Sequence, residues 1–243
     1  MDIHKPKAAH SIREFLIEIG TIICGILIAL GLEQGIEAVH HREISREARE
    51  AIRSEIGWNL EIFRRRAQIQ SCIDARLLEL EHLIVSTPLG AKLPRPLWVG
   101  RPQTWSIREG RWNAATSSGR TALLPAEEQA SYGGFHTAFQ DLQDEQRVEQ
   151  LAWADLRTLE TLPELDAAAR LQLIQALHRA RYANFRVKVA NVQITARARE
   201  VGLAPADWKN TSGGSRSVCI PMNTTREAAI KQTVPGRTAI AEP

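Results

Sequence analysis

The sequence predicts an all-α protein with one N-terminal transmembrane helix, a long-helix antiparallel bundle and a flexible C-terminal tail. Three observations lead to this fold class. Residues Ile19 to Leu32 form an uncharged apolar run. Apolar residues then recur at spacings of three and four along most of the chain, which is the period of an amphipathic helix. No segment alternates apolar and polar residues over the length of a strand, so an α/β fold is not expected.

The apolar run is long enough to cross a membrane. Extended to Phe15, it contains a single acid, Glu18, and about eighteen helical residues span the hydrocarbon core of a bilayer. A cleaved secretory signal and a buried core helix are the alternatives. No turn residues follow the run, and the chain continues directly into another helical pattern, which favours a retained anchor. We therefore expect a tail at 1–13 and a transmembrane helix at 14–39.

Basic residues on both sides of the span leave its orientation nearly balanced. Lys5, Lys7 and Arg13 precede the span, and four arginines, Arg42, Arg46, Arg49 and Arg53, follow it. Long domains translocate largely regardless of their charge, so the short basic tail should carry more weight. We expect the tail in the cytoplasm of a bacterial cell and the domain outside its inner membrane, in the periplasm, with a cytoplasmic domain as the alternative.

Small residues recur within the span and could let two such helices pack closely. They form pairs four residues apart, and the last pair is a GxxxG pattern. The six candidates for transmembrane packing are Gly20, Cys24, Gly25, Ala29, Gly31 and Gly35.

A helical bundle is expected over residues 40–203. No proline interrupts the chain between Pro6 and Pro88, which predicts one long helix or two nearly collinear ones. Its triplet Arg64-Arg65-Arg66 is interpreted as a solvated face. A loop rich in proline and glycine follows at 86–104, then a short helix with Trp105 and Trp112 that ends near Ser118. Residues 204–243 are rich in small and polar residues and are expected to form an irregular, partly disordered tail.

Two further long helices complete the expected bundle. The first begins at Pro125, with proline at the first helical position, and carries Tyr132, Phe135, Phe139, Leu142, Trp153, Leu156 and Leu159 on one face. The second begins near Pro163 and ends at Gly202. Its expected packing face is the stripe Leu171, Ile174, His178, Tyr182, Phe185, Val189, Val192 and Ala196.

One polar cluster and one cysteine pair are candidates for special roles. Glu145 and Glu149 lie one turn apart on the helix that precedes the one bearing His178, so a carboxylate and an imidazole could meet inside the bundle. Of the three cysteines, Cys72 and Cys219 could pair if the tail folds back onto the first long helix in an oxidising compartment. Whether they pair is left open.

The sequence gives no reason to expect an enzyme. It contains no phosphate loop, dinucleotide fingerprint, nucleophile elbow or zinc spacing. Two Glu-x-x-His pairs, at Glu37 and Glu79, lie on one helical stretch and cannot share a metal, so no metal or cofactor is expected. Basic and acidic residues interleave along the chain, which does not favour a nucleic-acid interface.

The N-terminal segment resembles a family of uncharacterised bacterial single-pass membrane proteins. The resemblance rests on Glu14 to Gln34 (EFLIEIGTIICGILIALGLEQ), which contains the pattern E-I-G-x-x-x-x-G-I-L-I-A-L, with Trp112 to Gly119 (WNAATSSG) and Ala152-Trp153. It covers residues 10–60 well and the remainder loosely. It implies a membrane-anchored helical protein, and it implies no activity or catalytic residues.

Two functions fit these expectations. The first is an interaction or scaffold protein that binds a partner protein or itself at the membrane. The alternative is a membrane-tethered periplasmic sensory or ligand-binding module, an analogy at the level of the fold.

Overall fold

The structure, a computed structural model, describes residues 12–207 and 217–233, and it confirms the predicted all-α fold. Within these ranges the only extended pairing is an isolated bridge between Lys92 and Glu164. The elements, in chain order, are α1 (Ile12–Gln68), α2 (Gln70–Ser86), α3 (Gly110–Ser117), η1 (Arg120–Leu123), α4 (Ala126–Leu156), η2 (Arg157–Glu160), α5 (Ala167–Glu200), η3 (Ser217–Cys219) and α6 (Arg226–Thr233).

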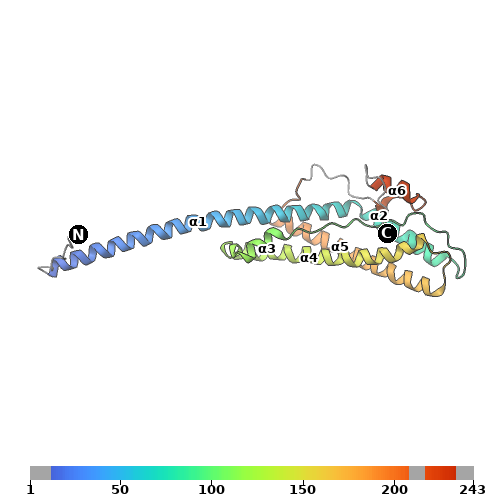
Figure 1. The fold of residues 1–243 in the computed structure, drawn as a ribbon, viewed down its shortest axis with the longest axis horizontal. Helices are drawn as coiled ribbons and strands as arrows, with labels where there is room; N and C mark the ends of the chain where they lie inside the picture. The colour runs from blue at the N-terminus through green and yellow to red at the C-terminus, as the bar shows by residue number, and fades with distance from the viewer. Residues whose placement is uncertain (1–11, 208–216, 234–243) are drawn as a thin grey trace, which may run out of the picture.

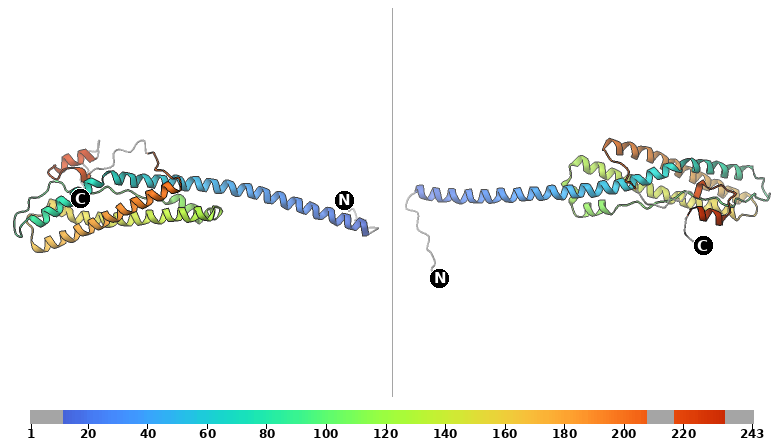
Figure 2. Two further views of the ribbon diagram at one scale, coloured as in Figure 1. Left: turned by 180° about the vertical axis from the view of Figure 1, so that it is seen from behind. Right: turned by 90° about the horizontal axis from the view of Figure 1, so that it is seen from above.

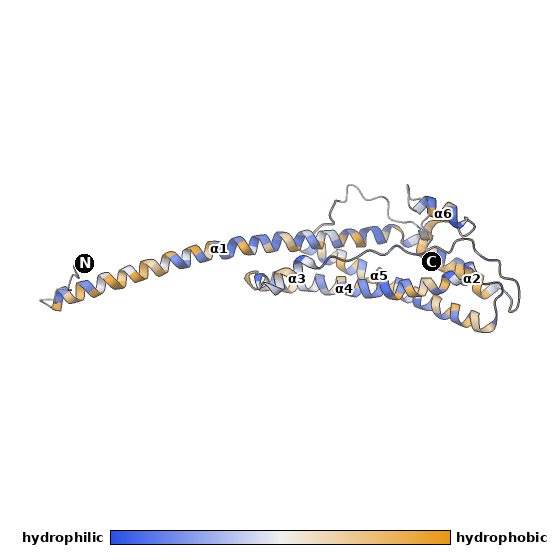
Figure 3. Ribbon diagram, in the orientation of Figure 1, coloured by the Kyte–Doolittle hydropathy of each residue, from blue (hydrophilic) through white to orange (hydrophobic). Residues whose placement is uncertain are grey.

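The N-terminal half of α1 projects from the bundle as a free rod (Figures 1 and 2). Its apolar segment has no buried side chain, and Figure 3 shows that segment as a run of hydrophobic residues. It is therefore not a core helix of the described domain. Its length and composition fit a membrane span, and they also fit a signal sequence. The helix has no break at the predicted boundary of 39 and 40, and burial begins at Ser45.

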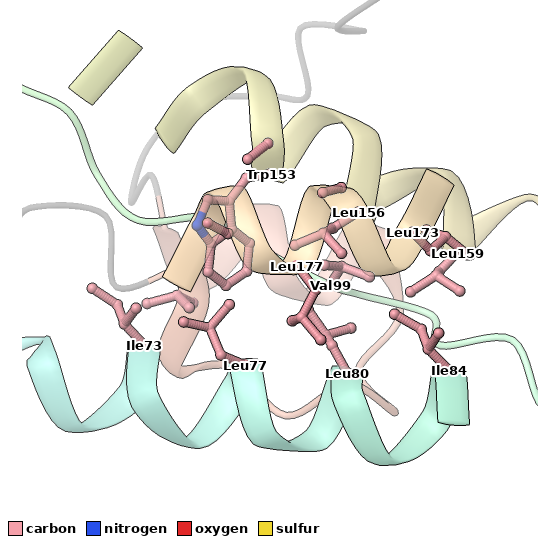
Figure 4. Close-up of a cluster of buried hydrophobic side chains, with 14 of the residues drawn as sticks. Ile73, Leu77, Leu80, Ile84, Val99, Trp153, Leu156, Leu159, Leu173 and Leu177 are labelled. Carbon is pink, nitrogen blue, oxygen red and sulfur yellow. The ribbon is translucent and has the colours of Figure 1, made fainter. Parts of the chain in front are cut away.

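The bundle packs α1 and α2 against the antiparallel pair α4 and α5 (Figure 1). Its interior forms two main hydrophobic clusters. The proximal core, nearer the projecting rod, contains Ile52, Ile56, Leu60, Phe63, Phe135, Phe139, Leu142, Val187 and Ile194. The distal core contains Ile73, Leu77, Leu80, Ile84, Trp153, Leu156, Leu173 and Leu177, several of which are drawn in Figure 4.

The predicted packing face of α4 is confirmed, because all seven of the predicted residues from Tyr132 to Leu159 are buried. The prediction for α5 is wrong. Most of its stripe from Leu171 to Ala196 faces away from the bundle, and His178 is exposed with it; only Ile174 and Val189 are partly buried. The buried face of α5 is the opposite one, formed by Leu173, Ala176, Leu177, Ala180, Ala183, Asn184, Val187, Ile194 and Ala198.

The buried face of α5 owes its position to small side chains. Ala176, Ala180 and Ala183 are fully buried and sit where a close helix neighbour leaves little room. Alanine allows close backbone approach between packed helices, and interior packing tolerates few voids. The opposite stripe contains the aromatic residues Tyr182 and Phe185 and dominates a hydrophobicity pattern, although the buried face also contains large residues, Leu173, Leu177, Val187 and Ile194. The sequence pattern therefore favoured the wrong face.

Buried polar side chains hold the long segment that connects α2 to α3. Asn59 of α1 donates to the carbonyl of Arg108 and accepts from its N–H, at 2.8 and 3.0 Å. The carboxylate of Glu55 accepts from the first backbone N–H groups of α3, at Arg111 and Trp112. Gln146 of α4 accepts from the N–H of Trp105, which lies before α3 and not within it. These bonds satisfy backbone groups that a covered loop would otherwise leave unpaired.

Part of the predicted irregular tail is ordered against α2. Residues 217–219 form η3, and α6 follows, so the expected disorder does not describe 217–233; residues 208–216 and 234–243 lie outside the described part. Trp98 Nε1 donates to the carbonyl of Ser217 at 2.9 Å, and Arg76 donates to the carbonyls of Val99 and Ile220. Gly100 has a φ of +70°, in the left-handed region, and a Cβ there would lie 2.5 Å from the carbonyl oxygen of Ser217.

Cys72 of α2 and Cys219 of η3 form a disulfide, which answers the question that the sequence left open. The two residues are 147 positions apart in sequence, and their Cα atoms are 4.9 Å apart. Cys24 is a free cysteine on the exposed part of α1. The disulfide links η3, in the C-terminal segment, to α2.

Loss of this disulfide should destabilise the folded domain. A cross-link closing a loop of this length is worth up to about 5 kcal/mol in the chain-entropy model, and removal of native disulfides usually costs about 2–5 kcal/mol. We expect Cys219→Ala, or reduction of the wild type, to lower the urea midpoint of the full-length chain in detergent, followed by tryptophan fluorescence. Cys24→Ala is the matched control and should leave the midpoint unchanged. Equal midpoints for Cys219→Ala and Cys24→Ala would contradict this prediction.

Candidate functional site

A buried ion pair separates the proximal core from the distal core. Arg66, in the last turn of α1, donates from Nη2 to Glu149 Oε1 of α4 at 2.6 Å. The two residues are only 4% and 1% exposed. Arg66 lies in sequence between Phe63 of the proximal core and Ile73 of the distal core, and Glu149 lies between Leu142 and Trp153. The pair therefore places two charged side chains between the two hydrophobic cores.

Hydrogen bonds extend from this ion pair to the surface through side chains of α5 and α2. Asn184 Oδ1 accepts from Arg66 at 3.1 Å and from Gln70 at 2.9 Å. Asn184 Nδ2 donates to Asp74 Oδ1 at 2.8 Å, and Lys188 donates to the other oxygen of Asp74 at 3.3 Å. We call this set, Arg66, Gln70, Asp74, Glu149, Asn184 and Lys188, the polar layer. Its members come from α1, α2, α4 and α5, so it joins all four long helices.

Burial and hydrogen bonding shift the pKa values within the polar layer in different directions. Burial raises the pKa of Glu149, and the attraction of Arg66 opposes the rise without cancelling it. Burial also lowers the pKa of Arg66, while Glu149 opposes that change. Burial alone would raise the pKa of Asp74, but hydrogen bonds from Asn184, Gln70 and Lys188 outweigh it and lower the pKa. The ionised form of Asp74 is thus favoured in the folded protein.

The Arg66–Glu149 pair satisfies only part of its own hydrogen-bonding capacity. Within the described residues, Arg66 Nε and Nη1, Glu149 Oε2 and the indole nitrogen of Trp153 have no partner. Burying charges costs several kcal/mol per ion, and a pair repays that cost only with good geometry and further bonds. Such a pair contributes little net stability, so its main effect is on how the helices align. It requires Arg66 and Glu149 to lie opposite each other, which sets the axial position of α1 against α4.

The polar layer also lies where the first long helix is interrupted. α1 ends at Gln68, and α2 begins at Gln70, with Ile69 between them at φ −104° and ψ 7°. Arg66 and Gln70, on either side of this break, both donate to Asn184 Oδ1. The polar layer therefore holds the junction at which α1 ends and α2 enters the distal core.

The predicted cluster of Glu145, Glu149 and His178 does not form. Glu149 is in the polar layer, as described above. Glu145 accepts from Arg186 at 3.0 Å at the edge of the α4–α5 contact. His178 is exposed on the outer face of α5, because the buried face of that helix is the opposite one. The hydrogen bond from Arg181 lowers the pKa of Glu81, and the charge of His178 adds a smaller effect in the same direction.

The predicted transmembrane-packing residues lie on two faces of α1. A helix turns about 100° per residue, so Gly20, Cys24, Gly31 and Gly35 share one side. Gly25 and Ala29 lie well away from them around the helix. All six are on the projecting rod, and nothing in the described chain lies within 4 Å of a Cβ built at any of the four glycines.

Sequence reasoning missed Arg66 because it stands in an arginine triplet. Arg64 and Arg65 both bind Glu61, as residues near the bundle edge do. Arg66 differs from them in its spacing: it lies three residues after Phe63 and seven before Ile73, which are both buried. That position on the apolar stripe is the signal that could have identified Arg66. Its partner Glu149 was a candidate only as part of the predicted cluster with Glu145 and His178.

Comparison of the chain with protein-family models, with curated proteins and with solved structures gave no significant match.

Breaking the Arg66–Glu149 pair from one side should be costly, whereas removing both charges should not. Glu149→Leu leaves an uncompensated buried charge on Arg66, which typically costs about 3–5 kcal/mol. The double variant Arg66→Met/Glu149→Leu should recover most of that loss. Urea unfolding of the full-length chain in detergent measures both. Glu50→Leu, which removes an exposed partner of Arg46, is the control and should cost less than about 0.5 kcal/mol. Equal losses in the single and double variants would show that the pair is not coupled.

Asp74 should make folding stability depend on acid pH. Its folded pKa is lowered, so it contributes stability above its ordinary value of 3.8, and that contribution is lost as the pH falls through the folded value. Because the side chain is partly exposed, we expect the contribution to be at most about 1 kcal/mol. The difference in unfolding free energy between wild type and Asp74→Asn should be largest near neutral pH and vanish below the folded pKa. An equal pH dependence of stability in wild type and Asp74→Asn would contradict this prediction.

Proposed function

We propose that this chain is a single-pass protein of a bacterial inner membrane whose helical domain, outside the cytoplasm, serves as an interaction or scaffold module. The observation that carries the proposal is the construction of α1. One unbroken helix begins in an unburied apolar segment and ends inside the bundle, at the polar layer. A module built this way keeps its domain at a fixed orientation relative to the membrane.

The disulfide supports a location outside the cytoplasm. Disulfides persist in oxidising compartments such as the bacterial periplasm and are rare in the reducing cytosol. The bond between Cys72 and Cys219 joins two half-buried residues that pack against the distal core. The basic residues that precede the span agree with this orientation, because positive charge is retained on the cytoplasmic side.

The alternative, a sensory or ligand-binding module, is favoured by a different observation. The polar layer joins the anchor helix to α2, α4 and α5 through charged hydrogen bonds. A ligand that displaced one of these groups would act directly on the end of α1. Such a module would therefore require a bound small molecule, whereas a scaffold requires a bound protein.

The topology can be measured with a reporter fused after Pro243 of the full-length chain. Alkaline phosphatase is active only outside the cytoplasm, and we expect activity in the membrane fraction. A fusion of green fluorescent protein at the same position is the matched reporter for the cytoplasm and should be dark after Sec export. Fluorescent, phosphatase-inactive membranes would place the domain in the cytoplasm, and phosphatase activity in the soluble fraction would mean that the apolar segment is a cleaved signal. Native mass spectrometry of the purified chain then separates a protein partner from a small ligand.

A further inference from the structure

An apolar face of α5 lies exposed on the outside of the bundle. Leu171, Tyr182, Phe185 and Val192 are 57%, 62%, 59% and 69% exposed. With Ile174, His178, Val189 and Ala196 they recur at spacings of three and four, so they follow one side of the helix for roughly 37 Å. We call these eight residues the outer stripe. Soluble domains rarely expose a continuous row of large apolar side chains, and such rows mark binding surfaces.

The outer stripe lies opposite the buried face. From the centre of the buried face at Ala180, the outer-stripe residues are turned by about 120–200°, at 100° per residue. Ile174 packs against the edge of the distal core and Val189 is partly buried, whereas Leu171, Tyr182, Phe185 and Val192 face away from the bundle. Two exposed apolar residues of α4, Val148 and Leu151, lie at the level of Tyr182 and Phe185, between the ion pairs that join α4 to α5.

Four basic side chains flank the middle of the outer stripe, and carboxylates of the same chain neutralise them; Arg170, Arg197 and Arg199, near the ends of the stripe, have no carboxylate partner among the described residues. Toward α4, Arg179 pairs with Asp155 at 2.7 Å and Arg186 pairs with Glu145 at 3.0 Å. Toward α2, Arg181 pairs with Glu81 at 2.5 Å and Lys188 pairs with Asp74 at 3.3 Å.

The neutral border along the middle of the stripe disfavours strongly charged binding partners. A strongly acidic or basic partner would find no excess charge of the opposite sign beside the stripe. A surface of the same kind, apolar with neutral borders, meets no like-charge repulsion and matches it. A second copy of this chain supplies a surface of that kind, its own outer stripe.

We propose that the outer stripe of α5 binds the outer stripe of a second copy of this chain, forming a parallel two-helix seam. The parallel direction rests on the proposed function, because chains anchored in one membrane have the same orientation. Equal orientation and a two-fold axis along the membrane normal make each residue of the seam face its own copy. The alternating spacing of three and four is the one that lets two helices stay in contact along their length.

The seam is tested on the full-length chain in detergent by light scattering of the protein–detergent complex. Wild type should be a dimer at micromolar concentration. Phe185→Glu/Val192→Glu places charges in the seam and should weaken dimerisation at least about tenfold. Both positions are exposed, so the variant should keep the wild-type circular dichroism and urea midpoint. Gln150→Glu, on an exposed face of α4, is the matched control and should remain dimeric.

Cross-linking in native membranes tests the symmetry of the seam. In a Cys24→Ser background, Phe185→Cys should form a disulfide-linked dimer on mild oxidation, and Gln150→Cys should not. A dimer that survives Phe185→Glu/Val192→Glu but is lost on Gly20→Leu/Gly31→Leu would assign association to the anchor and overturn the proposal. A monomer that carries a different protein, released by the outer-stripe variant, would overturn it in favour of that partner.

These outcomes also separate this inference from the proposed function. A monomeric wild type in the membrane fraction would refute the seam and leave the anchored module intact. A chain absent from the membrane fraction would refute the proposed function, and a dimer lost on Phe185→Glu/Val192→Glu would then still support the seam without its fixed parallel direction.

Discussion

The buried pair of Arg66 and Glu149 is the constraint on which the rest of the bundle depends. An arginine cannot give up its charge inside a protein, so its position in the core requires a carboxylate at the same level of a neighbouring helix. That requirement aligns α1 with α4, and Asn184 extends it to α5. The two hydrophobic cores then fill the space on either side. Replacement of such a pair by apolar residues of similar volume is often neutral for stability, so what the pair contributes is the alignment that its hydrogen bond requires.

A second set of interactions holds the parts of the chain that have no helical partner of their own. Asn59, Glu55 and Gln146 bind the backbone of the long loop, and Arg76 binds carbonyls of both the loop and the C-terminal segment. The disulfide between Cys72 and Cys219 closes this arrangement covalently. The buried polar residues therefore divide into those that join helices and those that attach irregular backbone to helices.

The two faces of α5 connect the architecture to the proposed function. Its alanine-rich face lies inside because small side chains permit close packing, and its aromatic residues are left outside. The ion pairs of α5 to α2 and α4 fix the helix in this rotation and leave the borders neutral along the middle of the outer face. In the proposed membrane-anchored chain, such a face is suited to association within the plane of the membrane, where all copies share one orientation.

The sequence by itself determined the helices, the long loop and the apolar N-terminal segment, because these depend on local periodicity and on proline and glycine positions. It also identified Cys72 and Cys219 as the one plausible pair. Only the tertiary structure decided which face of α5 is buried, that Arg66 is internal and that residues 217–233 fold against α2. Each of these depends on the shape and charge of a partner distant in sequence. For α5, two apolar faces compete, and hydrophobicity alone selects the face with the aromatic residues, whereas packing selects the face with the alanines.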